Sequence, residues 1–468
     1  KLWATNEDFK NDQRIRPNYS YLGVVTGRTS ASDPNLQQVP SRSVLGKLIK
    51  RLFASREGKL LIKVDYSAHE VRGWSIISGD QGVSDLFQTG TDLRNRFRVV
   101  PDPLIARRIV DEGDVHRLNA SYFFGIPITM REKIAEVRNS VKTVIFGLIY
   151  QQGDNGLAKT SGRTVKEIVD LKAKFLDRFP VGLKWFDKVK NFARKNLFVE
   201  SPLGRRRHLW ALMLPKDYPH RGFVVSSQER RSVNSPVQGF GSDFMMIGIR
   251  AINRLMYEHY EETGHYPDMH LSVSVHDSLT VEVAYEDVWL ALDFIEKGLT
   301  TEAARLVKER IPGFEFTSIP EIDYEIGATE KHVKGWDFSF ESMKELIKLT
   351  LETQVNELGY DVDIDEAYHT IMETQYQSMP DWMKKQLWSN NIKIESRGKD
   401  IRTLKEKKIA AKYLKELPGN IKELERRMAE EAEKSANTAS VGKTSLKKAI
   451  LKARKKRKAL RKYLEETK

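Results

Sequence analysis

The chain has 468 residues, no cysteine and a formal net charge of +14 at pH 7, with a pI near 9.4. The lack of cysteine excludes disulfides and thiolate metal sites, and no apolar stretch is long enough to cross a bilayer, so no membrane partner is expected. The positive charge favours a polyanionic partner, although a basic ribosome-associated or merely soluble protein is an alternative. No signal peptide opens the chain, and a start at Lys1 suggests a piece of a longer polypeptide.

The first 43 residues are expected to form a strand and then a long loop. Residues 1–25 end in a strand-like run, and residues 26–43, TGRTSASDPNLQQVPSRS, have the Gly, Ser, Asp, Pro and Asn content of a loop. The long basic and amide side chains of this loop suit contacts with phosphates or a minor groove, with a solvated surface loop as the alternative. These side chains are Arg28, Asn35, Gln37, Gln38 and Arg42.

Residues 59–80, KLLIKVDYSAHEVRGWSIISGD, combine a strand, a carboxylate and a helix. The apolar, β-branched run from Leu60 to Val64 predicts a buried strand, and Asp65 lies where this strand is expected to end. Ser67 is predicted to cap the following helix, with Glu70 reaching back to complete a capping box.

Residues 81–113 are charged and contain two prolines, which indicates an inserted loop or a short helix. Asp114 is expected to cap a helix that ends at Gly125, and a longer helix is predicted from about Arg131 to Gln151. Two cations and two aromatics recur at i+4 spacing on this longer helix and form one stripe. They are Arg138, Lys142, Phe146 and Tyr150. A plain amphipathic helix with extended cations is the alternative.

Two further helical regions are expected, one over 161–196, in which Pro180 ends a first helix and a second follows, and one over 226–260. The hairpin predicted at 198–209 carries arginines 205–207 at its tip, where a nucleic-acid contact and a solvated turn are about equally favoured. Pro236 and Gly239 are expected to break or open the second helical region.

Residues 271–283, LSVSVHDSLTVEV, alternate apolar and polar residues as a β-hairpin does. A three-residue connection, His276-Asp277-Ser278, would keep the apolar residues paired, with Val275 opposite Leu279. Asp277 then lies at the tip of the hairpin, although Asp is ordinarily just a turn former there.

The last part of the sequence begins with a predicted helix over 285–308 and a strand-like EIDYEIGAT. From 342 to 468 the chain is expected to be helical, highly charged and Lys-rich. A solvated helix pair is the alternative to a nucleic-acid contact or an arm for a replication partner.

Asp65 at a strand end and Asp277 at a hairpin tip can meet on one sheet. Two carboxylates there would hold two Mg²⁺ ions about 3.5–4 Å apart, as in-line displacement at phosphorus requires. Arg138 and Lys142 would supply positive charge for a triphosphate, and the aromatic half of the stripe offers stacking faces for a base. Together these groups indicate a nucleotidyltransferase.

Several segments resemble those of the bacterial and phage DNA polymerase I family, family A, in the same order. DYSAHEVR resembles its motif A, RNSVKTVIFGLIY its motif B (R-x₃-K-x₃-F-G-x₂-Y) and VHDS its motif C. TGRTSASDPNLQQVP, SPLGRRRH and VNSPVQGFGSD resemble further segments of the family. The resemblance covers roughly residues 20–335 and is specific, because several motifs occur in order.

The resemblance implies roles for individual residues. Asp65 and Asp277 would be the metal ligands, and Lys142 would join them as a catalytic residue. The residues expected to bind the nucleotide are Arg138, Lys142, Phe146, Tyr150, His116 and Glu70. Among these, Glu70 would exclude a ribose 2′-hydroxyl and Tyr150 would lie near the templating base. The residues expected to contact primer and template are Arg28, Asn35, Gln37, Arg42, Asn234, Gln238 and His276.

The resemblance also implies an α+β fold in the form of a right hand. The palm, an antiparallel sheet, would come from 1–113 and 229–341, with helical fingers at 114–228 and a basic helical C-terminal extension at 342–468. Family members carry a thumb, and often an exonuclease, before the TGR segment. Only 25 residues precede Thr26, so both are expected to be mostly absent, with no 3′–5′ exonuclease activity and poor processivity.

The implied reaction is template-directed transfer of deoxynucleotides from dNTPs to a primer 3′-hydroxyl, with release of pyrophosphate, in the cytoplasm of a bacterial or phage-infected cell. The chain departs from the family pattern in several places. Ala68 and His69 replace Gln and Ile, Gln151 replaces Gly, Ser278 replaces Glu, and residues 89–113 look inserted. The change at Ser278 makes a third carboxylate at the site doubtful.

Two other functions are weighed against this one. A single-subunit phage-type RNA polymerase shares the palm, but Glu70, Phe146 and the TGR segment argue against it. A catalytically silent nucleic-acid-binding module or replication scaffold would not need paired aspartates and paired cations.

Overall fold

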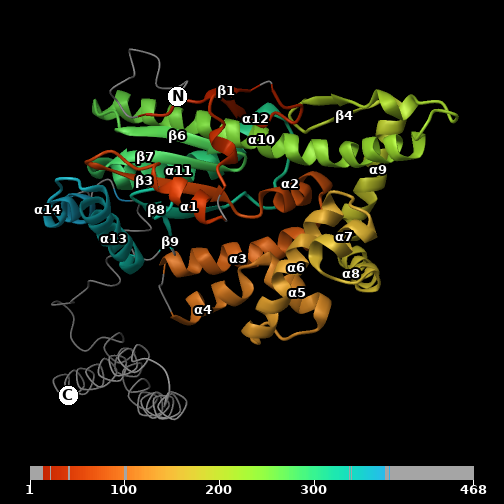
Figure 1. Cartoon of the computed structure of the whole chain (residues 1–468), viewed down its shortest axis with the longest axis horizontal. Coiled ribbons are helices and arrows are strands. Elements are labelled where there is room, and N and C mark those ends of the chain that lie inside the picture. The colour runs from red at the N-terminus through yellow and green to blue at the C-terminus, as the bar shows by residue number, and fades with distance from the viewer. Residues whose placement is uncertain are drawn as a thin grey trace, which may run out of the picture. The chain divides into compact units, whose positions relative to one another are not determined.

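The computed structural model describes residues 14–374, except residues 22, 41, 42, 100–102, 337 and 339, together with residue 379. Its centre is a five-stranded antiparallel sheet in the order β6-β7-β3-β8-β9 (Figure 1). The strands are β3 (Lys59–Tyr66), β6 (Met269–Val275), β7 (Ser278–Ala284), β8 (Ile322–Gly327) and β9 (Lys334–Trp336). Two small antiparallel pairs accompany it, β1 (Asn18–Ser20) with β2 (Ser30–Ser32), and β4 (Phe198–Glu200) with β5 (Arg206–His208). A mixed α+β fold around an antiparallel sheet is therefore confirmed.

Helices make up most of the remaining described chain. Those before β4 are, in chain order, α1 (Val44–Arg51), α2 (His69–Ser78), α3 (Gln81–Val99), α4 (Pro103–Glu112), α5 (Val115–Phe124), α6 (Arg131–Ile149), α7 (Asp154–Ser161), α8 (Val165–Arg178) and α9 (Pro180–Asn196). Those after β5 are α10 (Arg221–Thr263), α11 (Val288–Lys297), α12 (Ala303–Arg310), α13 (Phe340–Leu358) and α14 (Ile364–His369). Single turns are η3 (Leu36–Gln38), η4 (Trp210–Met213), η5 (Tyr285–Asp287), η6 (Gly298–Glu302) and η7 (Thr370–Thr374). No helix in the described part of the chain is both long and apolar enough to cross a membrane.

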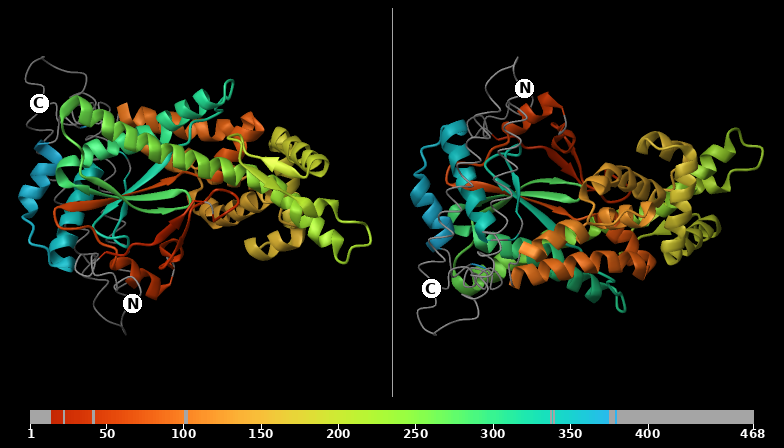
Figure 2. Two further views of the ribbon diagram at one scale, coloured as in Figure 1. Left: turned by 90° about the horizontal axis from the view of Figure 1, so that it is seen from above. Right: turned by 90° about the horizontal axis from the view of Figure 1, so that it is seen from below.

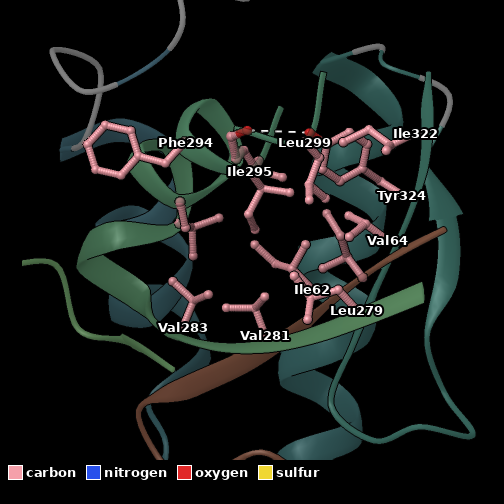
Figure 3. Close-up of a cluster of buried hydrophobic side chains, with 14 of the residues drawn as sticks. Ile62, Val64, Leu279, Val281, Val283, Phe294, Ile295, Leu299, Ile322 and Tyr324 are labelled. Atoms are coloured by element: carbon pink, nitrogen blue, oxygen red, sulfur yellow. Dashed lines mark hydrogen bonds between the residues drawn. The ribbon is translucent and has the colours of Figure 1, made fainter. Parts of the chain in front are cut away.

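The main hydrophobic core lies on one face of the sheet. Alternate residues of β3 point into it, and Leu60, Ile62 and Val64 are fully buried. Figure 3 shows Ile62 and Val64 among the side chains of this core. Helices α10, α11 and α12 contribute their own apolar side chains to this core. The ribbon of α10 runs along the sheet in the view from above (Figure 2). Because successive side chains of a strand point to opposite faces, Asp65 is directed away from this core.

A second core holds the helices of the middle of the chain together. Trp74 of α2 has no exposed surface and stacks against Phe175 of α8 and Phe186 of α9, with ring centroids 5.7 Å and 5.5 Å apart. Helix α10 contributes Val237 to this core and Phe244 to the core under the sheet. One long helix thus connects the sheet to the helical part of the molecule.

The stretch from 81 to 113 differs from its prediction as an irregular loop or short helix. It forms two helices, α3 and α4, that pack against one another. Val83 and Phe87 of α3 are buried in the second core, so apolar residues at helical spacing outweigh the effect of the two prolines. Pro103 is the first residue of α4, the position where a helix tolerates proline best.

Helix α10 is also more regular than predicted, because it runs unbroken through Pro236 and Gly239 for 43 residues. Gly239 has a packing function instead. A Cβ added there would lie 3.3 Å from the Ser201 Cβ, so the glycine allows α10 to approach the β4–β5 hairpin closely.

The β6–β7 hairpin forms as predicted, but its register differs by one residue. The connection has two residues, His276 and Asp277, so Val275 pairs with Ser278 rather than with Leu279. His276 adopts a positive φ of 56°, which a two-residue hairpin turn favours. A bulge between Leu271 and Val273 then shifts the register, a feature that apolar alternation cannot reveal.

Residues just beyond 341 belong to the core of the sheet, which differs from the separate extension expected to begin at 342. Helix α13 packs on β8 and β9, and Met343, Ile347 and Leu351 are fully buried. The buried amide of Gln354 donates to the Lys59 carbonyl and accepts from the Tyr285 hydroxyl, both at 2.5 Å. The Lys-rich end of the chain lies outside the described residues.

Candidate active site

The structure brings the two predicted aspartates together at one end of the sheet. Asp65 is the penultimate residue of β3 and pairs with Ser278, which follows Asp277 directly. The backbone N–H of Tyr66 donates to the Asp277 carbonyl at 3.0 Å, which fixes the hairpin turn beside the end of β3. Both aspartates line one cavity of about 500 Å³.

All the residues predicted to be catalytic or to bind the nucleotide line this same cavity. From the sheet and α2 come Asp65, Asp277 and Glu70, and from α5, α6 and the end of α6 come His116, Arg138, Lys142, Phe146 and Tyr150. Carboxylates therefore face cations and aromatic rings across one space, although these residues are far apart in the sequence.

Helix α6 presents the predicted stripe to the cavity because its members are one turn apart. The Lys142 ammonium lies 5.8 Å from the centroid of the Phe146 ring, and the Tyr150 ring is 6.5 Å from Phe146. The His116 ring of α5 also lies near Phe146, with ring centroids 5.8 Å apart. The aromatic ring of Phe146 is thus framed by a cation and two further rings, a suitable surface for a nucleobase.

Asp114 organises the cationic side of the cavity. As predicted, it caps α5, and its side chain accepts the backbone N–H groups of His116 and Arg117. Its other oxygen forms an ion pair with the Arg138 guanidinium. Burial would raise the pKa of Asp114, but the charge of Arg138 and these hydrogen bonds bring it below its ordinary value. Arg138 is therefore held at the cavity wall by a fully ionised partner.

His116 is neutral at pH 7. Burial lowers the pKa of His116 to about 4, with Lys142 and Arg138 adding to the effect and Asp114 opposing it. A neutral imidazole can donate one hydrogen bond without adding charge to the cavity.

The carboxylate of Asp65 is strongly affected by its surroundings. Enclosure by the protein raises the pKa of Asp65 to about 7, and the negative charges of Asp277 and Asp323 add to this, while Lys63 opposes it. Two carboxylates that repel one another at the edge of a cavity form a site that favours a cation.

Asp323 is a cavity residue that sequence reasoning missed. It pairs with Asp65 across β3 and β8, so Asp65 lies between Ser278 on one neighbouring strand and Asp323 on the other. Burial raises the pKa of Asp323, with Arg94 and Arg72 opposing this shift. The alternation in EIDYEIGAT predicted a strand, but only the pairing of β8 with β3 brings Asp323 next to Asp65.

Arg94 is a second residue that was missed, because it lies in the stretch predicted to be irregular. Its guanidinium donates to Glu321 at 2.8 Å, and Glu321 also accepts from Arg72 at 2.6 Å. Both arginines line the cavity. Helix α3 thus adds a cation beside the carboxylates.

Glu70 does not form the predicted capping box. Residue Ala68 occupies the N-cap of α2 in a left-handed conformation, with no side-chain cap. Glu70 instead accepts a hydrogen bond from the Arg28 guanidinium at 2.5 Å. Burial raises the pKa of Glu70, and the charge of Arg28 opposes the shift. The loop residue Arg28 is therefore the group that fixes Glu70 in place.

Some of the predicted DNA contacts lie together and others do not. Arg28, Gln238 and His276 line a narrow crevice beside Glu70 and Asp277. The side chain of Gln37 forms hydrogen bonds within the protein. Its amide donates to the Thr29 hydroxyl at 2.8 Å and to the Ser274 carbonyl at 2.9 Å.

The other three residues predicted to contact DNA are Asn35, Asn234 and Arg42, and each has different surroundings. Asn35 caps the turn η3 by accepting from the Gln37 backbone N–H at 3.0 Å. The buried Oδ1 of Asn234 has no hydrogen-bond partner. Arg42 lies outside the described residues.

A cavity of paired aspartates, cations and aromatics on an antiparallel sheet defines a nucleotidyltransferase-like site, and comparison with known proteins identifies its family. Residues 4–312 match the family model described as DNA polymerase family A. The chain belongs to this family.

Individual relatives agree with this assignment. DNA polymerase I of Pseudomonas aeruginosa is 32% identical over 270 residues, which cover 58% of this chain and 26% of that protein. Thermostable DNA polymerase I of Thermus aquaticus is 29% identical over 318 residues, which cover 68% of this chain and 32% of that protein. The chain therefore spans between a quarter and a third of the length of these relatives.

A solved structure shows the same fold. It is described as the POL domain of Pol1 from M. smegmatis in complex with DNA primer-template and dNTP. It matches with a TM-score of 0.54 and 24% sequence identity, over 69% of this chain and 49% of that one.

Proposed function

We propose that this chain catalyses template-directed DNA synthesis, transferring deoxynucleotides from dNTPs to a primer 3′-hydroxyl with release of pyrophosphate. The observation that carries the proposal is the cavity in which Asp65 and Asp277 face Arg138, Lys142 and Phe146. A pure binding module or scaffold has no need for two repelling carboxylates opposite two cations. Membership of DNA polymerase family A supports the same reaction.

We propose Mg²⁺ as the metal, bound by Asp65 and Asp277. The donors are oxygens only, and the charge of Asp277 adds to the effect of burial in raising the pKa of Asp65, more than Lys63 offsets. Among the described residues no group of three or more His, Cys, Asp or Glu is arranged to hold a metal. Two carboxylates with substrate phosphates and water as further ligands fit this composition. Two bound ions would activate the attacking hydroxyl and stabilise the leaving phosphate.

The residues on α5 and α6 would bind the nucleotide. Arg138 and Lys142 place positive charge where a triphosphate would lie, and neutral His116 would donate a hydrogen bond to the same group. Phe146 would stack on the base, with Tyr150 at the end of α6 beside the templating base. All of these residues line one cavity, which supports the assignment, because a bound nucleotide must be contacted both at its base and at its triphosphate.

Glu70 would select the sugar. A rigid carboxylate beside the nucleotide site leaves little room for a 2′-hydroxyl, and Arg28 keeps it rigid.

Arg28, Gln238 and His276 would contact the primer terminus and its template partner from the adjoining crevice. Asn234, with its unpartnered buried oxygen, would contact the template.

We further propose that the two cores correspond to two parts of a right-hand polymerase. The core under the sheet would be the palm and the helical core the fingers. The expected division assigned α2 and α3 to the palm, but Trp74 and Phe87 are buried in the helical core. In this structure the fingers would therefore extend over α2 and α3 as well as 114–228.

Primer extension with the full chain tests the proposal. Wild type should extend a primer with dNTPs when Mg²⁺ is present, but not without Mg²⁺, and only inefficiently with ribonucleotides. Asp65→Ala and Asp277→Ala should each reduce the rate of primer extension by several orders of magnitude, because each removes a ligand of the two metal ions. The affinity for duplex DNA should stay near wild type. Asp85→Ala, on the exposed side of α3, is the matched control. A variant at either metal position that keeps a tenth of the rate would contradict the assignment.

A further inference from the structure

Arg94 of α3 lines the active-site cavity, but the function proposed above does not use it. It lies within residues 89–113, which match none of the segments that resemble the family, so the resemblance assigns it no role. The side chain is 18% exposed. A cation is therefore held at the wall of the cavity rather than in open solvent.

The partners of Arg94 fix its guanidinium without satisfying all of its donors. Nη1 donates to Glu321 at 2.8 Å, and Nη2 lies 3.5 Å from the Gly113 carbonyl oxygen. A guanidinium has more N–H groups than these two contacts use, and it cannot lose its charge. Glu321 is also shared, because it accepts from the buried Arg72 at 2.6 Å. One carboxylate therefore pairs with two arginines beside the cavity.

The position of Arg94 corresponds to the far end of a bound triphosphate. The stripe on α6 runs from Arg138 to Tyr150, a distance of about 18 Å at 1.5 Å per residue. With the base at the Tyr150 end, the phosphates would extend towards Arg138. The Gly113 carbonyl beside Arg94 belongs to the residue before Asp114. Asp114 in turn forms the ion pair with Arg138, so both arginines approach the same end of the cavity.

Arg94 also acts on the carboxylate side of the cavity. Its charge opposes the rise in the pKa of Asp323, and Asp323 pairs with Asp65 across the sheet. Arg94 thus lies between the strand that carries a predicted metal ligand and the helix that carries Arg138. A triphosphate whose reacting phosphate is at the metals would have to pass this point on its way to Arg138.

We propose that Arg94 binds the β- and γ-phosphates of the incoming nucleotide and holds them as pyrophosphate after the transfer. This inference rests on the proposed polymerase function and adds a phosphate contact from outside the segments that resemble the family. The phosphate oxygens would accept from the N–H groups that Glu321 does not use, so the side chain is preorganised and keeps its protein partner. The planar guanidinium suits two parallel hydrogen bonds to one phosphate, which an ammonium cannot form.

The reverse reaction tests the proposal with inorganic pyrophosphate. An oxygen of pyrophosphate attacks the phosphorus of the last phosphodiester and forms a dNTP, while the primer 3′-oxygen leaves and takes up a proton. Arg94→Ala should raise the KM for pyrophosphate by about tenfold, the effect of losing one hydrogen bond to a charged group. The affinity for primer–template should be unchanged. Arg94→Lys, which keeps the charge but not the planar fork, should lie between wild type and Arg94→Ala.

A second measurement does not depend on catalysis. Calorimetric titration of the full chain with pyrophosphate and Mg²⁺, without DNA, should show the same weakening in Arg94→Ala. Arg96→Ala is the matched control, because Arg96 is exposed on the same helix. It follows Arg94 by two residues, a rotation of about 200° that directs it to the opposite side of α3. This control should leave the affinities for pyrophosphate and for primer–template unchanged.

Unchanged pyrophosphate affinity in Arg94→Ala would overturn the proposal. Equal losses for pyrophosphate and primer–template would also overturn it, because they would show a general loosening of the site. A lysine variant no better than the alanine variant would exclude a contact based on charge.

The two proposals fail separately. Primer extension by a chain whose pyrophosphate affinity does not depend on Arg94 would leave the polymerase function standing and remove the phosphate contact. Pyrophosphate binding that depends on Arg94, in a chain that cannot extend primers, would do the reverse.

Discussion

Asp65 should make the stability of the metal-free protein depend on pH. Its pKa is about 7 in the folded protein and about 3.8 in an unfolded chain. Well below pH 4 both states hold the proton, and as the pH rises towards 7 mainly the unfolded state loses it, so the folded state becomes relatively less stable. The penalty is fully present above pH 7. Because Asp65 keeps solvent contact through the cavity, we expect it to be on the order of 1 kcal/mol.

Asp65→Asn removes this penalty. In EDTA, the variant should therefore be more stable than wild type at pH 8 and about equally stable at pH 4, as measured by urea unfolding. Adding Mg²⁺ at pH 8 should stabilise wild type and not the variant. A variant that is less stable than wild type at pH 8 would show that the Asp65 carboxylate is compensated within the protein.

Sugar selection should depend on the ion pair between Arg28 and Glu70. Glu70→Ala should increase ribonucleotide incorporation relative to deoxynucleotide incorporation, because the carboxylate that crowds the 2′ position is removed. Arg28→Ala should change the ratio in the same direction, since Glu70 loses the partner that holds it. The ratio of kcat/KM values for the two nucleotides is the measurement. Glu70→Ala should not weaken α2 through the loss of a capping box, because Ala68 rather than Ser67 occupies the N-cap.

A folded Glu70→Ala variant with unchanged sugar preference would restrict Glu70 to a structural role. A change in Glu70→Ala without one in Arg28→Ala would show that packing alone fixes the carboxylate.

The residues of the cavity differ in how readily the sequence reveals them. Arg138, Lys142 and Phe146 share one helix, so their spacing alone predicts that they line one surface. Asp65 and Asp277 could be predicted from a strand end and a hairpin turn. Asp323 could not, because its position depends on which strand lies beside β3, and local sequence carries no information about that choice.

At the scale of elements, close packing between α2 and α9 should make Gly182 sensitive to substitution. A Cβ added at Gly182 would lie 2.0 Å from the Trp74 ring, and that ring is held between Phe175 and Phe186. Gly182→Ala should therefore destabilise the protein by about 1–3 kcal/mol, more than the gain of up to about 1 kcal/mol that alanine brings to a helix. Thermal or urea unfolding measures the change.

Gly222→Ala provides the control, because no atom lies within 4 Å of its added Cβ in α10. It should be neutral or slightly stabilising. Equal effects of the two substitutions would show that Trp74 can move aside.

The limits of α5 were predicted well, whereas the cap expected at Ser67 for α2 was not found. The Asp114 cap and the Gly125 end of α5 are as expected. The β6–β7 register was not, since a two-residue turn and a bulge together determine it. Pro236 was expected to interrupt α10, but packing on both cores along the helix outweighs one missing hydrogen bond.

At the scale of the whole molecule, the motifs specified the fold class and the meeting of distant segments. They did not predict that α13 completes the core, because a charged sequence with apolar residues at helical spacing fits an exposed helix equally well. The buried amide of Gln354 acts through tertiary contacts with Ser55, Lys59 and Tyr285 that have no local signature.

The Lys-rich end of the sequence leads to a prediction for the whole chain. Residues 437–468 contain twelve Lys and Arg against two Glu, most of the net charge of +14. If these cations contact DNA phosphates, binding releases one counterion for nearly every contact, and log affinity falls with log salt by about 0.9 per contact on duplex DNA. Deleting 437–468 should therefore flatten this slope and weaken duplex binding most at low salt, without changing the rate of nucleotide addition to a bound primer. Binding titrations from 50 to 200 mM salt, roughly the range over which such contacts matter, measure the slope. A control variant with the lysines and arginines of 437–468 replaced by Gln separates charge from length. An unchanged slope in the deletion would mean that this segment contacts a protein partner, or nothing, rather than DNA.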